Sequence, residues 1–360
     1  MCQQLGSVRL KTVITHKASM AYPSLAVNGR HGAGCPRNLV AILLGALLLV
    51  PTQAWSADQK LLRIGVTKIV SHAALDADEK GFEAALASAG FKEGVNVRYD
   101  RQNAQGDTAK AAAIAQKFEA DKVDLVHSIA TPTSQAAVRA IRTIPVVFSS
   151  ISDPVGAAVV PQDSAPGKKT GTNVTGVSDL WPVLLQMETY AKFVPKAKKW
   201  GTIYNPAEVN SVTHIKAMRA AAKSLGLELI EVQVSHSDAV EQAANSLVGK
   251  VQAITITSDN TTVAKFDILA QVCDKNKIPL FAGDVDSVPR GAIAAYGMDY
   301  FLVGYSAGKK AALVLKGVKP GDIPWGPVEK FSLVINQKAA RAQGVTVSPE
   351  LLKKADKVLE

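Results

Sequence analysis

The sequence is poor in cysteine, which excludes a fold built around disulfide bonds. It has three cysteines in 360 residues, and two of them, Cys2 and Cys35, precede or fall within a segment that we interpret below as an export signal. Loss of that segment leaves Cys273 alone. Cys273 shares an apolar helical pattern with Leu269 and Val272, which predicts a buried thiol that packs as a small hydrophobic side chain. A lone cysteine can also be a nucleophile, but no histidine lies in a recognisable partner motif.

Signatures of enzymes and cofactor sites are also missing. There is no Gly-x-Ser-x-Gly elbow and no Walker loop, and the turn after the first apolar run (67–72) reads TKIVSH rather than a glycine-rich dinucleotide turn. His72 and His127 could meet at strand ends, but no third ligand has metal-site spacing. We therefore expect a protein that is not an enzyme and that binds no metal and no cofactor.

No part of the chain concentrates positive charge beside aromatic residues. The formal net charge is +10, but residues 1–56 carry basic residues and no acid. The remaining chain has 36 Lys and Arg against 31 Asp and Glu, a formal net charge of +5. Such a mild charge without a basic patch argues against nucleic acid as a partner.

The sequence has one long hydrophobic run, from Leu39 to Val50. Arg30 and Arg37 precede it, and small residues follow it around Ala54 and Ser56. A run of this length suits the core of a signal peptide and is short for a membrane span. We expect residues 1–56 to be an export signal with upstream sequence, cleaved after Ala54 or Ser56, and the mature protein to be periplasmic. The alternative is an uncleaved anchor.

The rest of the chain alternates short apolar runs with helical periods. Such nearly continuous apolar runs predict strands that are buried on both faces. The predicted strands are Leu62–Val66, Val123–Val126, Pro145–Phe148, Val174–Val177, Trp200–Ile203, Leu229–Val232, Val251–Ile256, Pro279–Phe281 and Ala292–Ala295. The rhythm indicates an α/β fold with mostly parallel sheets and helices on both faces. A glycine-, serine- and proline-rich stretch at 161–173 separates two halves. A further helix at about 300–316 and a final strand-helix segment at 329–360 follow, and the helix has the place expected of a chain that returns to its first domain.

Polar loops follow the strands in both halves. In parallel α/β sheets, ligands bind beyond the carboxyl ends of the strands, so two sets of such loops predict two lobes that face one cleft. In the first half, Ser71-His72 and the start of the helix at Thr131, Thr133 and Ser134 are candidate ligand contacts. Thr131 or Thr133 should cap that helix, whose N-terminus could hold a carboxylate, although simple capping needs no ligand. Asp153 is a further candidate, or else only a turn carboxylate.

The second half carries amides and acids at the corresponding places. The loops supply the candidates Asn205, Asn210, Ser211, Asp259, Asn260, Thr261 and Asp284. Each acid could be only a helix cap. Two acids opposite a wall of hydroxyl and N–H groups would also suit a zwitterion, with the carboxylate on the first wall and the ammonium on the second.

Several of these segments together resemble a known family. They are Ile64-Gly65-Val66, Ser71 to Asp76, Ala130-Thr131-Pro132, Ser152-Asp153-Pro154, Asn173 to Asp179, Asp259-Asn260-Thr261 and the tail from Ile335 to Ala340 with Gly344-Val345 and Pro349. As an ordered set over about residues 61–358, they resemble the ABC-transporter substrate-binding family that includes tryptophan- and tyrosine-binding proteins.

The resemblance implies a type I periplasmic-binding fold with two Rossmann-like lobes and three crossovers. We place the N-terminal lobe at residues 57–178 plus 297–326 and the C-terminal lobe at 179–296 plus 327–360. By position, Thr131, Thr133 and Ser134 would meet the ligand carboxylate, and Asp153, Asp259, Asn260 and Asp284 would add polar contacts. Trp181 at the boundary between the halves could be a hinge or lid aromatic, or it could be buried there. It stands where a polar stretch is usual in the family and could narrow the pocket, which argues against an aromatic ligand.

The sequence therefore predicts a monomeric, exported solute-binding protein that closes on a small amino-acid-like molecule, carboxylate-bearing and possibly aromatic, and delivers it to the membrane permease of an ABC importer. Two alternatives remain: a periplasmic sensory ligand-binding protein, and a periplasmic enzyme that uses the same cleft.

Overall fold

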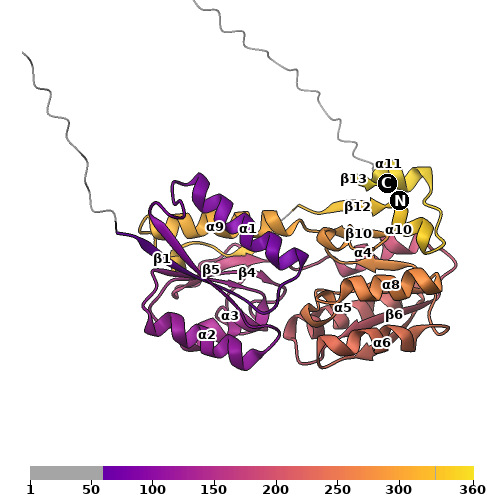
Figure 1. Ribbon diagram of the computed structural model, residues 1–360, viewed down its shortest axis with the longest axis horizontal. Helices are drawn as coiled ribbons and strands as arrows, with labels where there is room; N and C mark the ends of the chain where they lie inside the picture. Colours follow the sequence, from indigo (N-terminus) through magenta and orange to yellow (C-terminus); the bar gives the residue numbers. More distant parts are fainter. Residues whose placement is uncertain (1–59, 329) are drawn as a thin grey trace, which may run out of the picture. The chain divides into compact units, whose positions relative to one another are not determined.

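A computed structural model of the chain describes residues 60–328 and 330–360. The predicted export signal at 1–56 lies outside these residues. The described part forms two β-sheets, each flanked by helices (Figure 1). We call the sheet built first along the chain, with its helices, the N-terminal lobe, and the other the C-terminal lobe. No helix of the described residues is long and apolar enough to span a bilayer.

The N-terminal sheet has the strand order β11-β5-β4-β3-β1-β2, and all of its pairs are parallel. Its strands are β1 (Leu62–Lys68), β2 (Val97–Asn103), β3 (Leu125–Ile129), β4 (Val146–Ile151), β5 (Val174–Ser178) and β11 (Gly326–Pro327). The three central strands β3, β4 and β5 are buried along their whole length. This explains why their sequences are runs of apolar or small residues rather than alternating ones, with His127 of β3 as the exception.

The C-terminal sheet has the order β13-β12-β10-β9-β8-β6-β7. Its strands are β6 (Lys199–Tyr204), β7 (Glu228–Gln233), β8 (Ala253–Ile256), β9 (Leu280–Ala282), β10 (Ala294–Gly297), β12 (Ser332–Asn336) and β13 (Lys357–Leu359). The pair β10–β12 is antiparallel and the other pairs are parallel. The sheet is thus mixed at this one pair, where the chain enters it from the other lobe.

Helices cover both faces of the N-terminal sheet (Figure 1). On one face, α1 (Ala73–Ser88) packs against α9 (Tyr300–Leu315), and on the other α2 (Thr108–Ala120) packs against α3 (Thr131–Ala140). The α1–α9 contact is unusually close: a Cβ added to Gly304 would lie 1.8 Å from the backbone oxygen of Asp78. Only glycine allows this backbone approach, which fixes α9 firmly to the N-terminal lobe.

The C-terminal lobe is covered in the same way. α4 (Val183–Ala191) and α5 (Val209–Leu225) pack together, and α6 (Val240–Leu247) packs against α8 (Phe266–Asn276). The short α7 (Asn260–Val263) begins at the end of β8, and α10 (Gln337–Ala342) and α11 (Pro349–Lys354) follow β12. Three single turns complete the lobes: η1 (Ser237–Ala239), η2 (Val285–Ser287) and η3 (Pro320–Asp322). Cys273 is fully buried on α8, as the apolar pattern predicted.

The chain passes between the lobes three times, from β5 to α4, from β10 to α9 and from β11 to β12. The late helix α9 does pack in the N-terminal lobe, as its place in the sequence suggested. The two-lobed α/β fold with three crossovers is therefore confirmed. The residue at which each lobe begins and ends stays a prediction of the sequence.

Three described strands, β2, β11 and β13, were not predicted. β2 has the sequence VRYDRQN and lies at the edge of its sheet, where only Val97 is buried, so it lacks the apolar run that marks the other strands. β13 is a three-residue edge strand with the same lack of burial. Edge strands tolerate charged side chains, which hides them from a search for hydrophobic runs.

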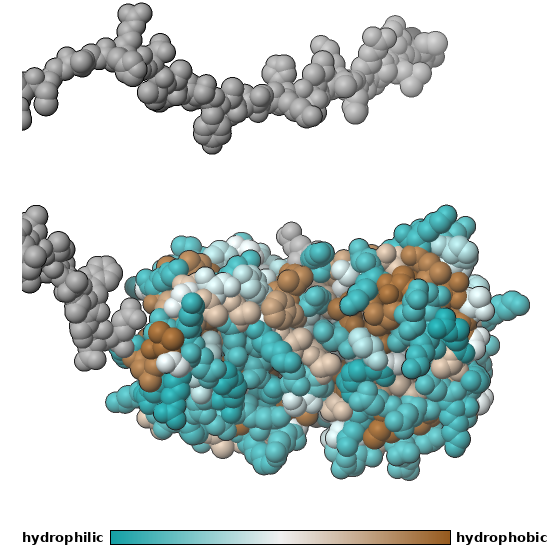
Figure 2. All heavy atoms as spheres, turned by 45° about the horizontal axis from the view of Figure 1, so that its top comes forward, coloured by the Kyte–Doolittle hydropathy of each residue, from teal (hydrophilic) through white to brown (hydrophobic). Residues whose placement is uncertain are grey.

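Figure 2 shows that hydrophilic side chains cover most of the face in view, with hydrophobic ones gathered in separate patches.

Candidate functional site

A cavity of about 370 Å³ lies where strand ends of the two lobes face each other. The N-terminal lobe contributes the end of β1, the β2–α2 loop and one side each of α2 and α3. The C-terminal lobe contributes the loops after β6, β7 and β8. The position agrees with the rule that ligands of parallel α/β sheets bind beyond the carboxyl ends of the strands.

The N-terminal wall of the cavity is a groove between α2 and α3. Thr108, Ala112 and Gln116 recur every fourth residue on α2 and so share one side of that helix. On α3 the lining positions are spaced three or four residues apart, and their side chains are Pro132, Gln135, Ala136, Arg139 and Ala140. Ile69 and Val70 add apolar surface at the end of β1. This wall therefore combines apolar surface with polar side chains, which are Gln105, Thr108, Gln116, Gln135 and Arg139.

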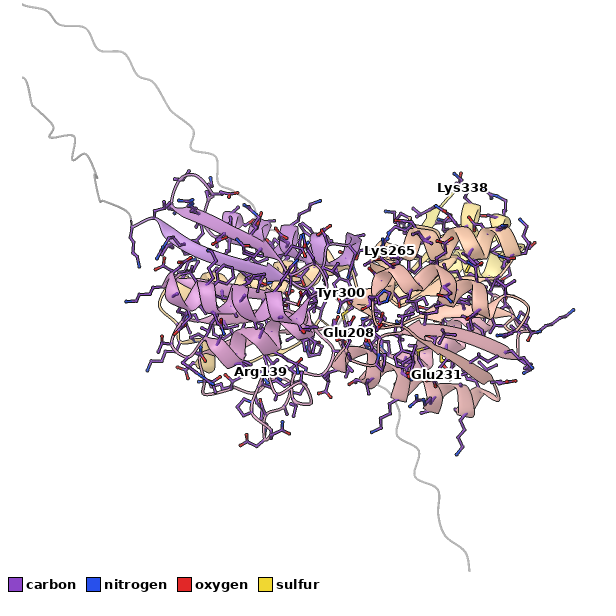
Figure 3. The ribbon with its side chains drawn as sticks, turned by 60° about the horizontal axis from the view of Figure 1, so that its bottom comes forward. Arg139, Glu208, Glu231, Lys265, Tyr300 and Lys338 are labelled. Carbon is purple, nitrogen blue, oxygen red and sulfur yellow. The ribbon has the colours of Figure 1, made fainter. Side chains whose placement is uncertain are left out.

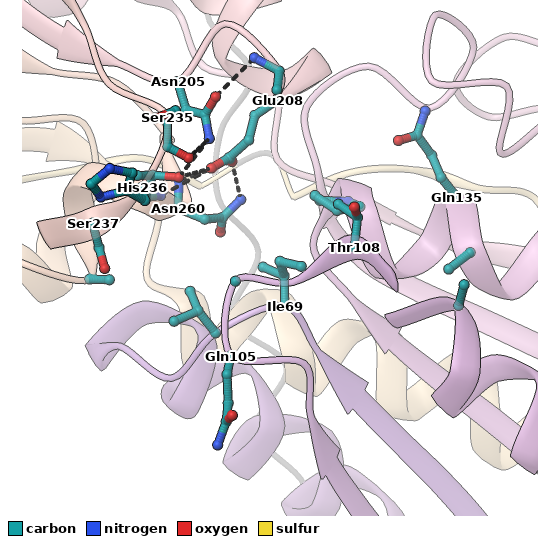
Figure 4. Close-up of a pocket in the computed structure, with 18 of the residues that line it drawn as sticks. Ile69, Gln105, Thr108, Gln135, Asn205, Glu208, Ser235, His236, Ser237 and Asn260 are labelled. Carbon is teal, nitrogen blue, oxygen red and sulfur yellow. Dashed lines mark hydrogen bonds between the residues drawn. The ribbon is translucent and has the colours of Figure 1, made fainter. Parts of the chain in front are cut away.

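The C-terminal wall is polar, and its polar groups bind one another (Figure 4). Glu208 lies at the centre: its carboxylate accepts from the backbone N–H groups of Asn260 at 3.1 Å and Thr261 at 3.0 Å, and from both of their side chains. Asn210 Nδ2 donates to the same carboxylate at 3.0 Å. Asn205 Nδ2 donates to Thr261 Oγ1 at 3.0 Å, and Asn205 Oδ1 accepts from Ala207 N–H. The wall is thus held rigidly before any ligand binds.

The acids of this lobe that the sequence offered for an ammonium group are used inside the lobe. Asp259 is fully buried and accepts from the N–H groups of Asn205 and Thr262, both at 2.7 Å, and from Ser211 Oγ at 2.6 Å. Asp284 is buried and accepts from Ser287 N–H at 2.8 Å and Ser287 Oγ at 2.9 Å, so it caps η2. Burial raises the pKa of Asp284, and the bonds from Ser287 oppose this shift. Neither side chain lines the cavity.

The predicted N-caps of α3 are wrong. Ala130 occupies the N-cap position with φ 78°, and no side chain caps this helix. Thr133 Oγ1 donates backwards to the carbonyls of Ile129 and Ala130, and Ser134 Oγ donates to Ser128 Oγ at 2.8 Å. Both hydroxyl groups are buried and bonded within the lobe, since they lie on the side of the helix that faces the sheet.

Thr131 differs from its two neighbours. Its Oγ1 is buried and has no hydrogen-bond partner among the described residues.

Asp153 accepts from Gly156 N–H at 2.8 Å, which is the turn interaction that the sequence left open as an alternative. Ser71 Oγ donates to Asp76 at 2.7 Å and stays within its own lobe.

Two hydrogen bonds join the lobes beside the cavity. Ser152 Oγ and Ser258 Oγ lie 3.2 Å apart, and His72 Nε2 lies 3.5 Å from Asn260 Oδ1. Burial lowers the pKa of His72 to about 4, so its imidazole is neutral at pH 7. We call these pairs the cross-lobe contacts. They can form only when the two lobes are close together.

The Ser152–Ser258 contact belongs to a longer buried network. Asp179, just after β5, accepts from Ser152 Oγ at 3.0 Å and from Tyr300 Oη at 2.5 Å. Asp179 and Tyr300 flank two of the three crossovers, from β5 to α4 and from β10 to α9. On the other side, His214 Nδ1 lies 2.6 Å from Ser258 Oγ. The network therefore connects the crossovers to the faces of both lobes.

Trp181 does not narrow the cavity. Its indole is 5% exposed, stacks on His214 with ring centroids 4.8 Å apart and lies over Gly283, where an added Cβ would come within 1.7 Å of the ring. It fills space between the crossovers and the C-terminal lobe and is not among the lining residues. The expectation that Trp181 reshapes the pocket is therefore wrong.

The predicted candidates fall into three groups. Asn205, Asn260 and Thr261 line the cavity, and His72 touches Asn260 from the other lobe. Asn210, Ser211 and Asp259 stand behind the lining residues and bond to them or to their loop. The candidates that do not line it and bond within their own lobe are Ser71, Thr133, Ser134, Asp153 and Asp284. Thr131 does not line it either, and its Oγ1 has no partner among the described residues.

The sequence reasoning missed Glu208, Gln135 and Arg139. Glu208 lies inside a loop that was singled out, and an acid just before a helix could have drawn attention to it. Gln135 and Arg139 lie within a helix, where polar residues normally face solvent. Only the packing of α2 beside α3 shows that they line a cavity.

Comparisons with known proteins identify the family. The family described as "ABC transporter substrate binding protein" matches residues 63–359. A tyrosine-binding protein of Clostridioides difficile is 39% identical over 285 residues, which are 79% of this chain and 81% of that protein. A solute-binding protein of only 14% identity still shares the fold, with a TM-score of 0.56.

Two solved structures differ in how well they superpose. A Streptococcus domain in complex with L-Trp has 34% identity and a TM-score of 0.78, and covers 83% of this chain and 99% of that one. A ligand-free, open substrate-binding protein from Clostridium difficile has 36% identity and the same coverage, but a TM-score of 0.61. Together with the two-lobed, type I periplasmic-binding architecture, the family match over nearly all of the described residues places this chain among the substrate-binding proteins of ABC transporters, which bind their substrates and are not enzymes.

Proposed function

We propose that the protein is exported to the periplasm, closes as a monomer on a small amino-acid-like ligand and delivers it to the membrane permease of an ABC importer. The observation that carries this proposal is the cavity lined by both lobes. A ligand in that position touches both walls at once, so it binds the closed arrangement more tightly than the open one and shifts the population toward closure.

The arrangement of the lobes supports closure. The two solved relatives have nearly equal identity to this chain and cover it equally, yet the L-Trp complex superposes better than the ligand-free, open structure. Because the two identities are nearly equal, the gap in TM-score favours a difference in lobe arrangement over a difference in sequence. The cross-lobe contacts at Ser152–Ser258 and His72–Asn260 agree with a closed arrangement.

The chemistry of the two walls supports an amphiphilic ligand. Pockets for small molecules commonly enclose about 300–1,000 Å³ and combine apolar surface with a few polar groups. The cavity has about 370 Å³, a wall of mixed apolar and polar side chains on the N-terminal lobe and a polar wall on the C-terminal lobe. This suits an amino acid with a sizeable hydrophobic side chain, in line with the tyrosine and L-Trp that the relatives bind.

Isothermal titration calorimetry of the purified protein with L-tryptophan, L-tyrosine and L-leucine tests the proposal. We expect saturable binding of at least one of them, together with a smaller radius of gyration in small-angle X-ray scattering after the ligand is added. L-glutamate and D-glucose serve as controls that should bind more weakly. If no amino acid binds, the proposed ligand class is wrong.

A further inference from the structure

Arg139 has a special place in the cavity. It lies in the last turn of α3, and no other lysine or arginine is among the described residues that line the cavity. Its side chain is exposed, and it forms no ion pair with a carboxylate of the part of the chain that the structure describes. Figure 3 labels it on the N-terminal lobe and Glu208 near the boundary between the lobes. An unpaired guanidinium on a cavity wall is suited to hold a carboxylate, which it can bind with two parallel hydrogen bonds.

Gln135 lies one turn earlier on the same side of α3, four residues before Arg139. Its Nε2 donates to the backbone oxygen of Ala157 at 3.0 Å, which fixes the amide and leaves Oε1 as an acceptor with no partner from the described residues. A fixed acceptor beside a guanidinium matches the two charged groups of an α-amino acid, whose ammonium and carboxylate are attached to one carbon.

The opposite wall offers no comparable pair. Both oxygens of Glu208 accept from Asn260 and Thr261, and Asp259 is fully buried with both oxygens bonded. An ammonium group would have to displace these donors. Because the free charge and the free acceptor both belong to α3, the polar end of a zwitterion fits best there.

We propose that Arg139 and Gln135 bind the α-carboxylate and the α-ammonium of the ligand, with the ligand side chain directed over Ile69, Val70 and Pro132 toward the C-terminal lobe. This inference rests on the proposed function and assigns the orientation of the ligand. The Arg139–Gln135 pair thus takes the place of the N-terminus of α3, which the sequence suggested as the carboxylate site. There, Thr133 and Ser134 already form hydrogen bonds within the lobe.

The test compares L-tryptophan with L-tryptophanamide, which lacks the carboxylate, and with N-acetyl-L-tryptophan, which lacks the ammonium. In wild-type protein we expect both derivatives to bind more weakly than L-tryptophan. Arg139→Gln should weaken L-tryptophan about ten-fold and leave the amide nearly unchanged, because a hydrogen bond to a charged group is worth roughly that factor. Arg139→Lys should fall between the two, since lysine keeps the charge but not the fork.

Arg142→Gln is the matched control, because Arg142 is exposed and does not line the cavity. Gln135→Leu should reduce the preference for L-tryptophan over its N-acetyl derivative. The inference is overturned if Arg139→Gln keeps the full preference for the acid over the amide, and above all if Thr131→Val removes that preference instead. Failure of wild-type protein to bind any of the three compounds, L-tyrosine or L-leucine would instead contradict the proposed function.

Discussion

The two walls of the cavity use polar side chains in opposite ways. On the C-terminal wall, Glu208, Asn260, Thr261 and Asn205 bind one another, and Asp259 fixes them from behind. On the N-terminal wall, Arg139 and one oxygen of Gln135 have no partner within the described chain. The hydrogen bonds within the C-terminal wall fix the shape of that wall. The groups without a partner on the N-terminal wall can instead form hydrogen bonds to a ligand. A charged side chain near a ligand site therefore indicates recognition only when its hydrogen-bonding capacity is still free.

The difference follows from helix termini. The first N–H groups of a helix have no partner within the helix, and a buried helix start must find acceptors elsewhere. At α7 these acceptors are Glu208 and Asp259, which between them take the N–H groups of Asn260, Thr261 and Thr262. The acids of the C-terminal wall are thereby needed for the fold.

Replacing Asp259 with alanine tests whether the acids of the C-terminal lobe serve the fold rather than the ligand, and it has the largest expected effect. The change leaves three buried donors without an acceptor, from Asn205, Ser211 and Thr262. We expect the free energy of unfolding to fall by about 4 kcal/mol, because each buried donor left unpaired costs about 1–3 kcal/mol and part of this is recovered by water. Urea unfolding followed by circular dichroism measures the loss.

Asp153→Ala is the matched control for that measurement. Asp153 also accepts from a backbone N–H, that of Gly156, but lies half-buried in a turn. We expect a loss below about 1 kcal/mol, typical of a partly solvated hydrogen bond. Equal stability of Asp259→Ala and wild type, with loss of ligand binding, would instead make Asp259 a ligand contact.

The N-terminal lobe also has a buried acid, Asp78 on α1, but its hydrogen bonds come from side-chain hydroxyl groups rather than from the backbone N–H groups of a helix start. It is fully buried and accepts from the hydroxyl groups of Ser149 and Ser150. The imidazole of His127 lies 3.5 Å from its Oδ1, but burial lowers the pKa of His127 to about 3, so this neighbour is neutral. Burial raises its pKa from 3.8 to about 7, and the negative charge of Asp179 adds to the shift while the two hydroxyl groups oppose it. A raised pKa means that the folded state holds this proton where the unfolded state has lost it, so stability falls as the pH rises from 3.8 to about 7.

Asp78→Asn removes this dependence. We expect wild-type protein to lose on the order of 2 kcal/mol between pH 5 and pH 8 through this group, since one pKa unit corresponds to 1.36 kcal/mol. The variant should lose less over the same range. Some slope should remain, because burial also raises the pKa of Asp286 to about 7. Urea titrations at the two pH values give the comparison, and identical slopes for both proteins would show that Asp78 is ionised throughout.

The fold was largely predictable because burial leaves a mark on sequence. Strands covered on both faces, such as β4 and β5, consist of apolar or small residues along their whole length, and each was found from that pattern. β2 was missed because it lies at the sheet edge and carries Arg98, Asp100 and Arg101. Packing constrains the centre of a sheet far more than its edge.

The site was predictable in place but not in detail. Strand ends had to converge on one cleft, and Asn205, Asn260 and Thr261 do line it. Whether Asp259 caps a helix or meets a ligand depends on where three donors lie, which spacing alone does not reveal. Arg139 looks like an ordinary surface residue until the groove between α2 and α3 is known.

The smallest expected effect concerns the contact between the walls rather than either wall alone. Ser258→Ala removes the hydroxyl that lies 3.2 Å from Ser152 across the lobes and 2.6 Å from His214. Losing about 1 kcal/mol from the closed state lowers its population, and apparent affinity falls in proportion to the competent fraction. We expect L-tryptophan to bind about five-fold more weakly, mainly through faster dissociation in stopped-flow fluorescence.

Ser71→Ala is the control, because Ser71 also lies at a strand end but donates to Asp76 within its own lobe. It should leave the dissociation rate unchanged. Small-angle scattering separates a closure effect from a binding effect: Ser258→Ala should give a larger mean radius of gyration without ligand and reach the wild-type value at saturation. An unchanged dissociation rate and radius would mean that the Ser152–Ser258 contact adds nothing to closure, and the ligand alone would then have to hold the two walls together.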